Sequence, residues 1–190
     1  MFRFSVKHDE AALVRRAQSG DTAAMKILYE SNVQYLTAVC YRYLGSQDDA
    51  KDVLQEAFIK IFSAIGRFEF KGEGSLRSWM TRIVINESIS RIRKKKKDIE
   101  VFVVDHLPDI PDEDPDPEGI PPSVLMDLIS KLPPGYRTIL NLHVFEQKSH
   151  KEIAAMLGIK ENSSTSQYHR AKAMLAEMIR KYRNEQGLEE

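Results

Sequence analysis

A proline-rich acidic segment near the middle of the chain constrains the fold more than any other feature of the sequence. Residues 108–119 read Pro-Asp-Ile-Pro-Asp-Glu-Asp-Pro-Asp-Pro-Glu-Gly. The segment has almost no apolar surface to bury, and its prolines lack the backbone N–H that a helix or sheet needs. We therefore expect two folded modules, residues 1–97 and 122–190, joined by an acidic flexible linker at residues 98–121.

The distribution of charge separates the same three parts. The 190 residues carry a formal net charge of zero. Residues 1–97 nevertheless hold 18 Lys and Arg against 11 Asp and Glu, residues 98–122 hold none against 9, and residues 123–190 hold 10 against 8. Two basic modules are compatible with nucleic-acid binding, which the neutral total alone argues against.

Hydrophobic periodicity predicts an all-α protein. Apolar residues recur at three- and four-residue steps within residues 25–43 and 53–65, and again from Ser75 to about Lys97. After the linker, the same pattern covers residues 124–132, 136–145, 151–157 and 163–182. No segment shows the alternation that is typical of a strand.

Several functional classes are disfavoured by what the sequence lacks. Cys40 is the single cysteine, which excludes internal disulfides and a Cys-rich zinc site. With no apolar run of about twenty residues and no signal-peptide pattern at Met1, we expect a cytoplasmic protein. The acids between Asp48 and Glu56 raise the alternative of a metal or nuclease site, but they crowd a helix N-terminus and have no second acidic cluster or histidine pair. Without a phosphate-binding loop or a nucleophile–base pair, we expect no enzyme, metal, cofactor or small-molecule substrate.

Residues 149–175 predict a helix-turn-helix. Ser149 can cap a short amphipathic helix that Gly158 ends, and a second helix follows after a few residues. The small side chain of Ala154 permits the two helices to approach closely. An ordinary helical hairpin with a polar outer face is the alternative.

The outer face of the second of these helices would meet the major groove of duplex DNA. Its tip, residues 161–167, offers hydroxyls and amides rather than guanidinium groups, so we expect this module alone to bind DNA weakly. The candidate contacts to upstream duplex DNA are Ser163, Thr165, Ser166, Gln167, His169, Arg170 and Lys172.

The first module combines a basic helix end, residues 91–97, with aromatic side chains in and after the loop at residues 68–74. Aromatic rings beside cations can stack on unpaired bases. A core tryptophan beside a solvated helix end is the alternative. The candidate contacts to a melted strand are Phe68, Phe70, Lys71, Trp79, Arg82, Asn86, Arg91 and Arg93.

Two blocks of the sequence resemble the sigma-E-like group of the extracytoplasmic-function (ECF) sigma factors. Residues 48–62, Asp-Asp-Ala-Lys-Asp-Val-Leu-Gln-Glu-Ala-Phe-Ile-Lys-Ile-Phe, and residues 75–86 are similar to region two of that family. Residues 132–140, Leu-Pro-Pro-Gly-Tyr-Arg-Thr-Ile-Leu, and residues 149–154 are similar to region four. The resemblance implies a sigma factor that binds core RNA polymerase, directs promoter-specific transcription initiation and opens the promoter.

The resemblance also implies a role for each block. The loop at residues 68–74, with Trp79, Arg82 and Asn86, would capture the opened minus-ten element and hold a flipped-out base, and residues 163–172 would read the minus-thirty-five element. The implied partners are core RNA polymerase, promoter DNA and an anti-sigma factor, with no insertion into a membrane. Residues 48–62 would dock on the clamp helices of the largest polymerase subunit, with candidate contacts at Asp48, Asp49, Asp52, Gln55, Glu56 and Lys60.

One stretch departs from the family pattern. Where the family commonly has Gly-Thr-Val, a basic residue, Ser and Arg, residues 162–167 read Asn-Ser-Ser-Thr-Ser-Gln. Ser164 thus takes the place of an apolar packing residue, and Thr165 and Gln167 take the places of cations. The rival interpretations are a stand-alone helix-turn-helix regulator and an anti-sigma or adaptor protein that only grips polymerase or its sigma factor.

Overall fold

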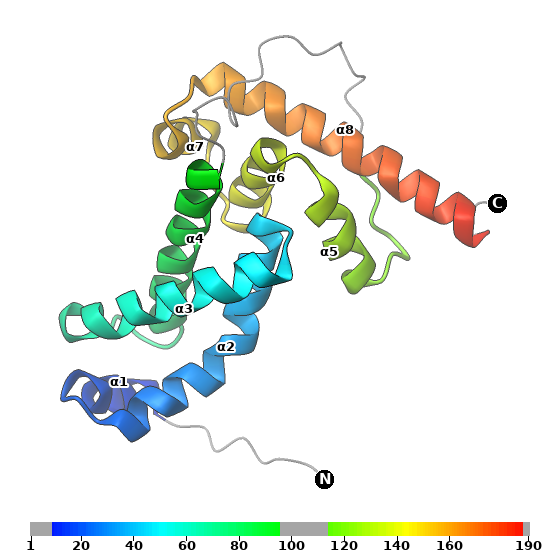
Figure 1. The fold of residues 1–190 in the computed structure, drawn as a ribbon. Coiled ribbons are helices and arrows are strands. Elements are labelled where there is room, and N and C mark those ends of the chain that lie inside the picture. Colours follow the sequence, from blue (N-terminus) through cyan, green and yellow to red (C-terminus); the bar gives the residue numbers. More distant parts are fainter. Residues whose placement is uncertain (1–8, 96–113, 188–190) are drawn as a thin grey trace. The chain divides into compact units, whose positions relative to one another are not determined.

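The computed structural model describes residues 9–95 and 114–187, so most of the expected linker lies outside the described residues. The chain divides into two compact units: the first holds Met1–Cys40 and Asp48–Ser88, and the second holds Tyr41–Gln47 and Ile89–Glu190. Both units are helical, and the described ranges contain no strand, which confirms the predicted all-α class (Figure 1). Within the same ranges, no helix is long and apolar enough to cross a membrane.

The first unit is built from helices that meet around one apolar core. Its elements are α1 (Glu10–Gln18), α2 (Thr22–Leu44), α3 (Gln47–Ala64), the short 3-10 helix η1 (Ile65–Arg67) and α4 (Ser75–Lys95). Helices α2, α3 and α4 are described with the first unit, which holds most of each. The core side chains come from α1, α2, α3 and α4 and include Val14, Leu36, Val39, Phe58, Ile61, Met80 and Val84. The chain breaks between α1 and α2, where the carboxylate of Asp21 caps α2 by accepting the N–H groups of Ala23 and Ala24 at 2.9 and 3.1 Å.

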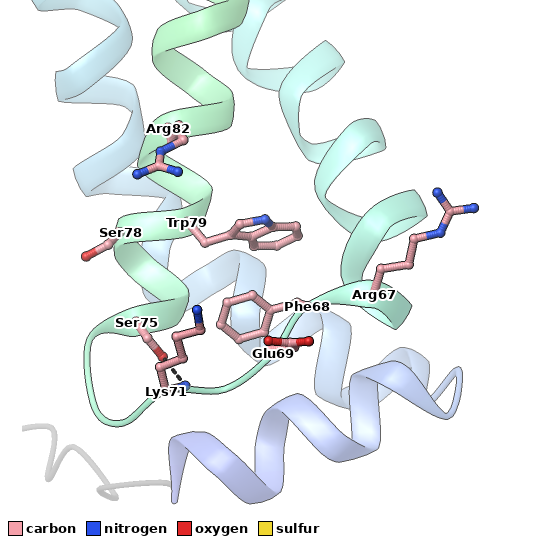
Figure 2. Close-up of a pocket in the computed structure, with 8 residues that line it drawn as sticks. All are labelled: Arg67, Phe68, Glu69, Lys71, Ser75, Ser78, Trp79 and Arg82. Carbon is pink, nitrogen blue, oxygen red and sulfur yellow. Dashed lines mark hydrogen bonds between the residues drawn. The ribbon is translucent and has the colours of Figure 1, made fainter. Parts of the chain in front are cut away.

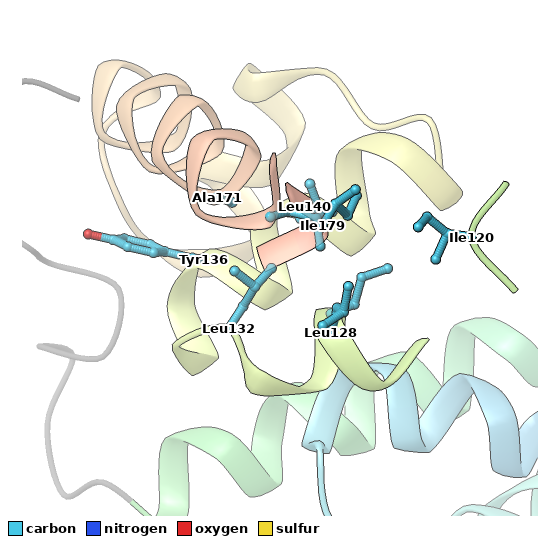
Figure 3. Packing of buried hydrophobic residues seen from close by; sticks show 9 residues of the cluster. Ile120, Leu128, Leu132, Tyr136, Leu140, Ala171 and Ile179 are labelled. Atoms are coloured by element: carbon cyan, nitrogen blue, oxygen red, sulfur yellow. The ribbon is translucent and has the colours of Figure 1, made fainter. Parts of the chain in front are cut away.

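The second unit packs three helices around a second core (Figure 3). Its elements are α5 (Pro122–Lys131), α6 (Pro134–Leu140), the π-helical turn η3 (Asn141–Phe145), α7 (His150–Leu157) and α8 (Glu161–Gln186). The core residues lie on α5, α6 and α8 and at the flanks of α5, and include Ile120, Leu128, Leu132, Tyr136, Leu140, Ala171 and Ile179.

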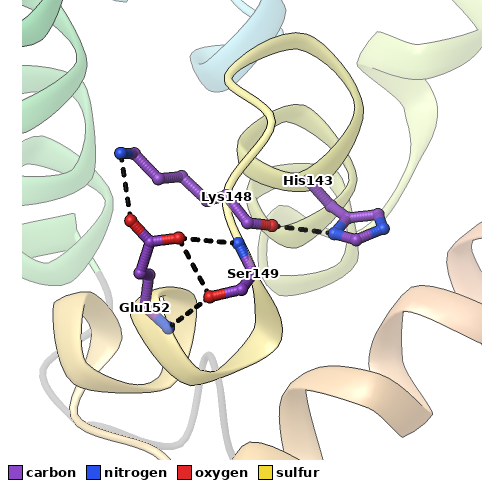
Figure 4. A network of polar contacts seen from close by, with 4 residues as sticks. All are labelled: His143, Lys148, Ser149 and Glu152. Atoms are coloured by element: carbon purple, nitrogen blue, oxygen red, sulfur yellow. Dashed lines mark hydrogen bonds and ion pairs between the residues drawn. The ribbon is translucent and has the colours of Figure 1, made fainter.

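Helices α7 and α8 form the predicted helix-turn-helix. Ser149 caps α7 with a reciprocal pair of bonds: its Oγ accepts the Glu152 N–H at 3.2 Å, and its own N–H donates to Glu152 Oε2 at 2.9 Å (Figure 4). Gly158 ends α7 with φ at +70°, a left-handed conformation that glycine adopts without steric cost, and its N–H donates to the Ala154 carbonyl at 2.8 Å. The chain then turns into α8 at Glu161.

Candidate nucleic-acid interface

A pocket of about 400 Å³ opens on the first unit between the loop that follows η1 and the first turns of α4 (Figure 2). The ring centroids of Phe68 and Trp79 lie 4.9 Å apart with an angle of 37° between the ring planes. Both side chains line the pocket and are half-buried, so they form an apolar wall that a flat ring can stack on.

Cations surround this aromatic wall. Arg67, Lys71 and Arg82 line the pocket and are exposed, and Glu69 is the one carboxylate among the lining residues. Cationic side chains next to an aromatic platform suit a nucleotide, because the platform takes the base and the cations take the phosphate.

The loop between η1 and α4 owes its path to two glycines. Gly72 and Gly74 have φ of +113° and +83°, which residues with a side chain rarely adopt. Ser75 Oγ accepts the Lys71 N–H at 3.2 Å (Figure 2). The same oxygen donates to the Gly72 carbonyl at 2.6 Å, which closes the turn. The turn brings Lys71 and the start of α4 to the same pocket as Phe68.

The pocket contains half of the predicted contacts to a melted strand. Those that line it are Phe68, Lys71, Trp79 and Arg82. Those outside its lining are Phe70, a residue that is 37% exposed, and Asn86, Arg91 and Arg93, which lie further along α4. The assignment of all eight to DNA stays a prediction.

The structure adds pocket residues that the sequence analysis did not select. Ser75 and Ser78 precede Arg82 at helical steps of three and four residues, so counting back along α4 from Arg82 would have found them. Arg67 is the last residue of η1, and no pattern in the sequence marks it.

The predicted polymerase contacts share the outer face of α3. All six are exposed except Asp49, which is half-exposed. Lys60 Nζ lies 2.7 Å from Glu87 Oε2 on α4. Ile59 is 68% exposed on the same helix, and its helical step from Asp52 and Glu56 places an apolar side chain among these polar ones. The sequence analysis did not select Ile59.

The predicted duplex contacts on α8 differ in exposure. Ser166 is exposed, whereas Ser163, Thr165, His169 and Arg170 are half-exposed. Gln167 is only 2% exposed, which corrects its assignment to the outer face. The reason is its position: residues 164, 167, 171 and 175 recur at steps of three and four and form the buried face of α8.

Lys172 is engaged by a carboxylate from the end of the linker. Its Nζ lies 2.6 Å from Asp114 Oδ1, and its side chain is 12% exposed. Two residues on, Asp116 accepts from Arg183 of the same helix at 3.0 Å. The described end of the acidic segment therefore lies against cations of α8.

Ser164 has a polar partner in the packed face between α7 and α8. It is fully buried, and its Oγ lies 3.0 Å from His150 Nδ1. The His150 ring stacks on His143, with centroids 4.5 Å apart and planes 10° apart. His143 Nδ1 is 2.8 Å from the Lys148 carbonyl, which orients the ring (Figure 4). Burial and the neighbouring His143 and His169 lower the pKa of His150.

The comparisons with known proteins match both units. Residues 28–98 match the family model of Sigma-70 region 2, and residues 123–175 match that of Sigma-70 region 4. The ECF RNA polymerase sigma factor SigW of Bacillus subtilis is 30% identical over 179 residues, which cover 88% of this chain and 95% of SigW. The chain belongs to the ECF RNA polymerase sigma factors.

Another ECF sigma factor agrees with this assignment, and a solved sigma factor shares the fold. SigE of Mycolicibacterium smegmatis is 29% identical over 175 residues, which cover 88% of this chain and 67% of SigE. The sigma factor RpoE of Bartonella quintana, solved with the anti-sigma factor NepR, shares the fold with a TM-score of 0.50 at 22% identity, over 82% of this chain and 96% of RpoE.

Membership of the ECF sigma factors confirms the predicted family and the predicted function, promoter-specific initiation with core RNA polymerase. This membership replaces the rival interpretations, a stand-alone regulator and an anti-sigma or adaptor protein.

The region 2 match contains α3 and the aromatic pocket, and the region 4 match contains α7 and the start of α8. Helix α1 precedes both matches. In the part of the chain that the structure describes, no group of three or more His, Cys, Asp or Glu side chains could hold a metal ion.

Proposed function

We propose that this sigma factor captures one unpaired base of the opened minus-ten element in the pocket of Figure 2. The observation that supports the proposal is the pair of rings, Phe68 and Trp79, beside the exposed guanidinium group of Arg82. Extruding a base from a duplex costs a few kcal/mol. Stacking on aromatic side chains returns about 1–3 kcal/mol per base, so contacts with core polymerase contribute the remainder.

In this proposal each of the two modules binds a different element of the promoter. Residues 1–97 bind core polymerase through α3 and open the minus-ten element, and residues 122–190 read the minus-thirty-five element with α8. Residues 98–121 connect them across about 70 Å, two helical turns of DNA. Residues 98–113, which precede the part packed on α8, reach roughly 55 Å at full extension, and the modules themselves, with α8 about 39 Å long, cover the rest of the span.

The same proposal covers regulation and place of action. The chain acts as a non-catalytic initiation factor, because the phosphodiester chemistry belongs to core polymerase. We expect it in the cytoplasm, together with the chromosome. An anti-sigma factor is its expected inhibitor, in line with the partner of RpoE in the Bartonella quintana complex.

The pocket is tested with fork-junction promoters selected from a library in the presence of core polymerase. Trp79→Ala should weaken binding of the holoenzyme to the selected fork junctions by about 10-fold or more, because stacking is worth about 1–3 kcal/mol. Arg82→Ala should weaken the same binding, because it removes a cation that can contact a phosphate. Arg15→Ala removes an exposed cation from α1 and serves as the control with no expected effect.

Binding of each variant to core polymerase, and its circular-dichroism melt, separate a pocket effect from misfolding. Arg82 is exposed, so its replacement leaves the core intact even where that of the half-buried Trp79 does not. Equal fork-junction affinity for wild type and Arg82→Ala, with tight binding to closed duplex in the absence of core, would contradict the proposal.

A further inference from the structure

Helix α1 contacts the pocket loop through its first and last residues. The helix is nine residues long, and the carboxylate of Asp9 caps it by accepting the N–H groups of Ala11 and Ala12 at 3.0 and 3.3 Å. Leu13, Val14 and Ala17 are buried, so one face of α1 is anchored in the first unit. This anchored helix leaves its two end residues, Glu10 and Gln18, to reach the loop.

Glu10 binds the end of the loop where α4 begins. Its Oε2 accepts the Gly74 N–H at 2.8 Å, and its Oε1 accepts the Leu76 N–H at 3.3 Å. The first N–H groups of a helix have no partner within the helix and carry partial positive charge. The Glu10 carboxylate therefore acts as an N-cap for α4 that is supplied from a different helix.

Gln18 binds the opposite end of the loop. Its side-chain Nε2 donates to the Ile65 carbonyl at 3.1 Å and to the Phe68 carbonyl at 2.8 Å. An amide NH₂ has two donors, so the side chain can satisfy both carbonyls at once. The second bond fixes the backbone of the residue whose ring packs on Trp79.

The two contacts share one rigid support. Glu10 and Gln18 are eight residues apart on an α-helix, a separation of about 12 Å at 1.5 Å per residue. We infer that α1 is a brace that holds both ends of the loop at residues 65–76, and that Glu10 and Gln18 are positioning residues for capture of the unpaired base. The inference rests on the proposed function of the pocket.

A brace that positions the loop for base capture affects the affinity for the captured base, whereas a purely structural role affects the affinity for every DNA alike. A scan of abasic sites along the non-template minus-ten strand first identifies the position whose base the wild-type holoenzyme captures. The measured quantity is then the ratio of affinities for fork junctions with and without the base at that position. The ratio reports the pocket alone, because all other contacts are common to the two DNAs.

Glu10→Ala and Gln18→Ala should lower this ratio by about 5- to 10-fold, the loss expected for hydrogen bonds that involve a charged group or hold two carbonyls. Affinity for the abasic fork junction and for core polymerase should stay within twofold of wild type. Glu10→Gln, which keeps an acceptor without the charge, should fall between wild type and Glu10→Ala. Glu30→Ala and Gln34→Ala on the exposed surface of α2 are matched controls with an unchanged ratio.

The outcomes separate the brace from the pocket. Two results would overturn the brace. In the first, Glu10→Ala and Gln18→Ala lower the affinities for both fork junctions, with and without the base, and leave the ratio unchanged. In the second, both variants have the wild-type ratio while Trp79→Ala lowers it. If Trp79→Ala and Arg82→Ala leave the ratio unchanged as well, the proposed function of the pocket fails first.

Discussion

His150 makes the second unit sensitive to acid. Its pKa lies below the ordinary value of 6.5, because burial disfavours the imidazolium and the charges of His143 and His169 add to this effect against the opposing Glu161. The unfolded chain therefore takes up this proton at a higher pH than the folded chain. The stability contributed by a neutral His150 is complete above about pH 6.5 and is lost as the pH falls below it.

We expect amide hydrogen exchange in α7 and α8 to accelerate between pH 7 and pH 5.5, after correction for the intrinsic exchange rate. His150→Gln should flatten this dependence, because glutamine can still reach Ser164 Oγ but does not titrate. Residues 9–95 contain no histidine, so amides of α2 and α4 are the internal control. An equal pH dependence in both units would contradict the assignment to His150.

Sequence patterns predict the burial of individual residues better than they predict the partners of those residues. Cys40, the single cysteine, is fully buried, and burial raises the pKa of its thiol to about 12 against the opposing effect of a hydrogen bond with Ser88. The family pattern predicted Ser164 at a packing position, and its helical spacing from residues 167, 171 and 175 places it on the buried face of α8. The spacing could not supply its partner His150, because the alignment of two side chains 14 residues apart depends on the turn between the helices.

Elements with strong local signals were predicted well, and those held by distant contacts were not. The capping residue Ser149 and the stop at Gly158 mark α7 in the sequence, and the structure has both. Helix α1 was not among the predicted helices. Its contacts with the pocket loop join residues 47 to 66 positions apart, and hydrogen bonds from side chains to backbone leave no periodic trace in a sequence.

The turn between α7 and α8 depends on Gly158. Its φ is +70°, and a Cβ built at this position would meet no atom within 4 Å. Gly158→Ala should therefore destabilise the second unit by about 1–2 kcal/mol through backbone strain alone. Amide exchange of α7 and α8 measures this loss, which should come without a change in their chemical-shift pattern beyond the turn.

Gly66→Ala is the matched control, because Gly66 also faces open space but lacks a positive φ. A compatible Gly-to-Ala change lowers the entropy of the unfolded chain and should be neutral or slightly stabilising. Equal destabilisation by both substitutions would show that strain at Gly158 is not the cause.

Although the whole molecule has a net charge of zero, its acidic segment at residues 108–119 contacts basic side chains of α8. The acidic segment ends at residues that engage α8, with Asp114 on Lys172 and Asp116 on Arg183. Lys172 was predicted to contact upstream DNA, and a phosphate would have to displace the Asp114 carboxylate. We therefore expect the described end of the linker to compete with duplex DNA for this cation.

Asp114→Asn should tighten binding of the holoenzyme to a closed duplex that carries the minus-thirty-five element by up to about 5-fold at low salt. An ion pair whose carboxylate is 86% exposed is worth about 0–1 kcal/mol. If Lys172 then gains one phosphate contact, the slope of log affinity against log salt should steepen by about 0.9. Glu177→Gln removes the same charge from an exposed site on α8 without touching the ion pair. A gain of equal size and slope in Glu177→Gln would assign the effect to net charge. A gain confined to Asp114→Asn, and abolished by adding Lys172→Gln, would assign it to release of Lys172.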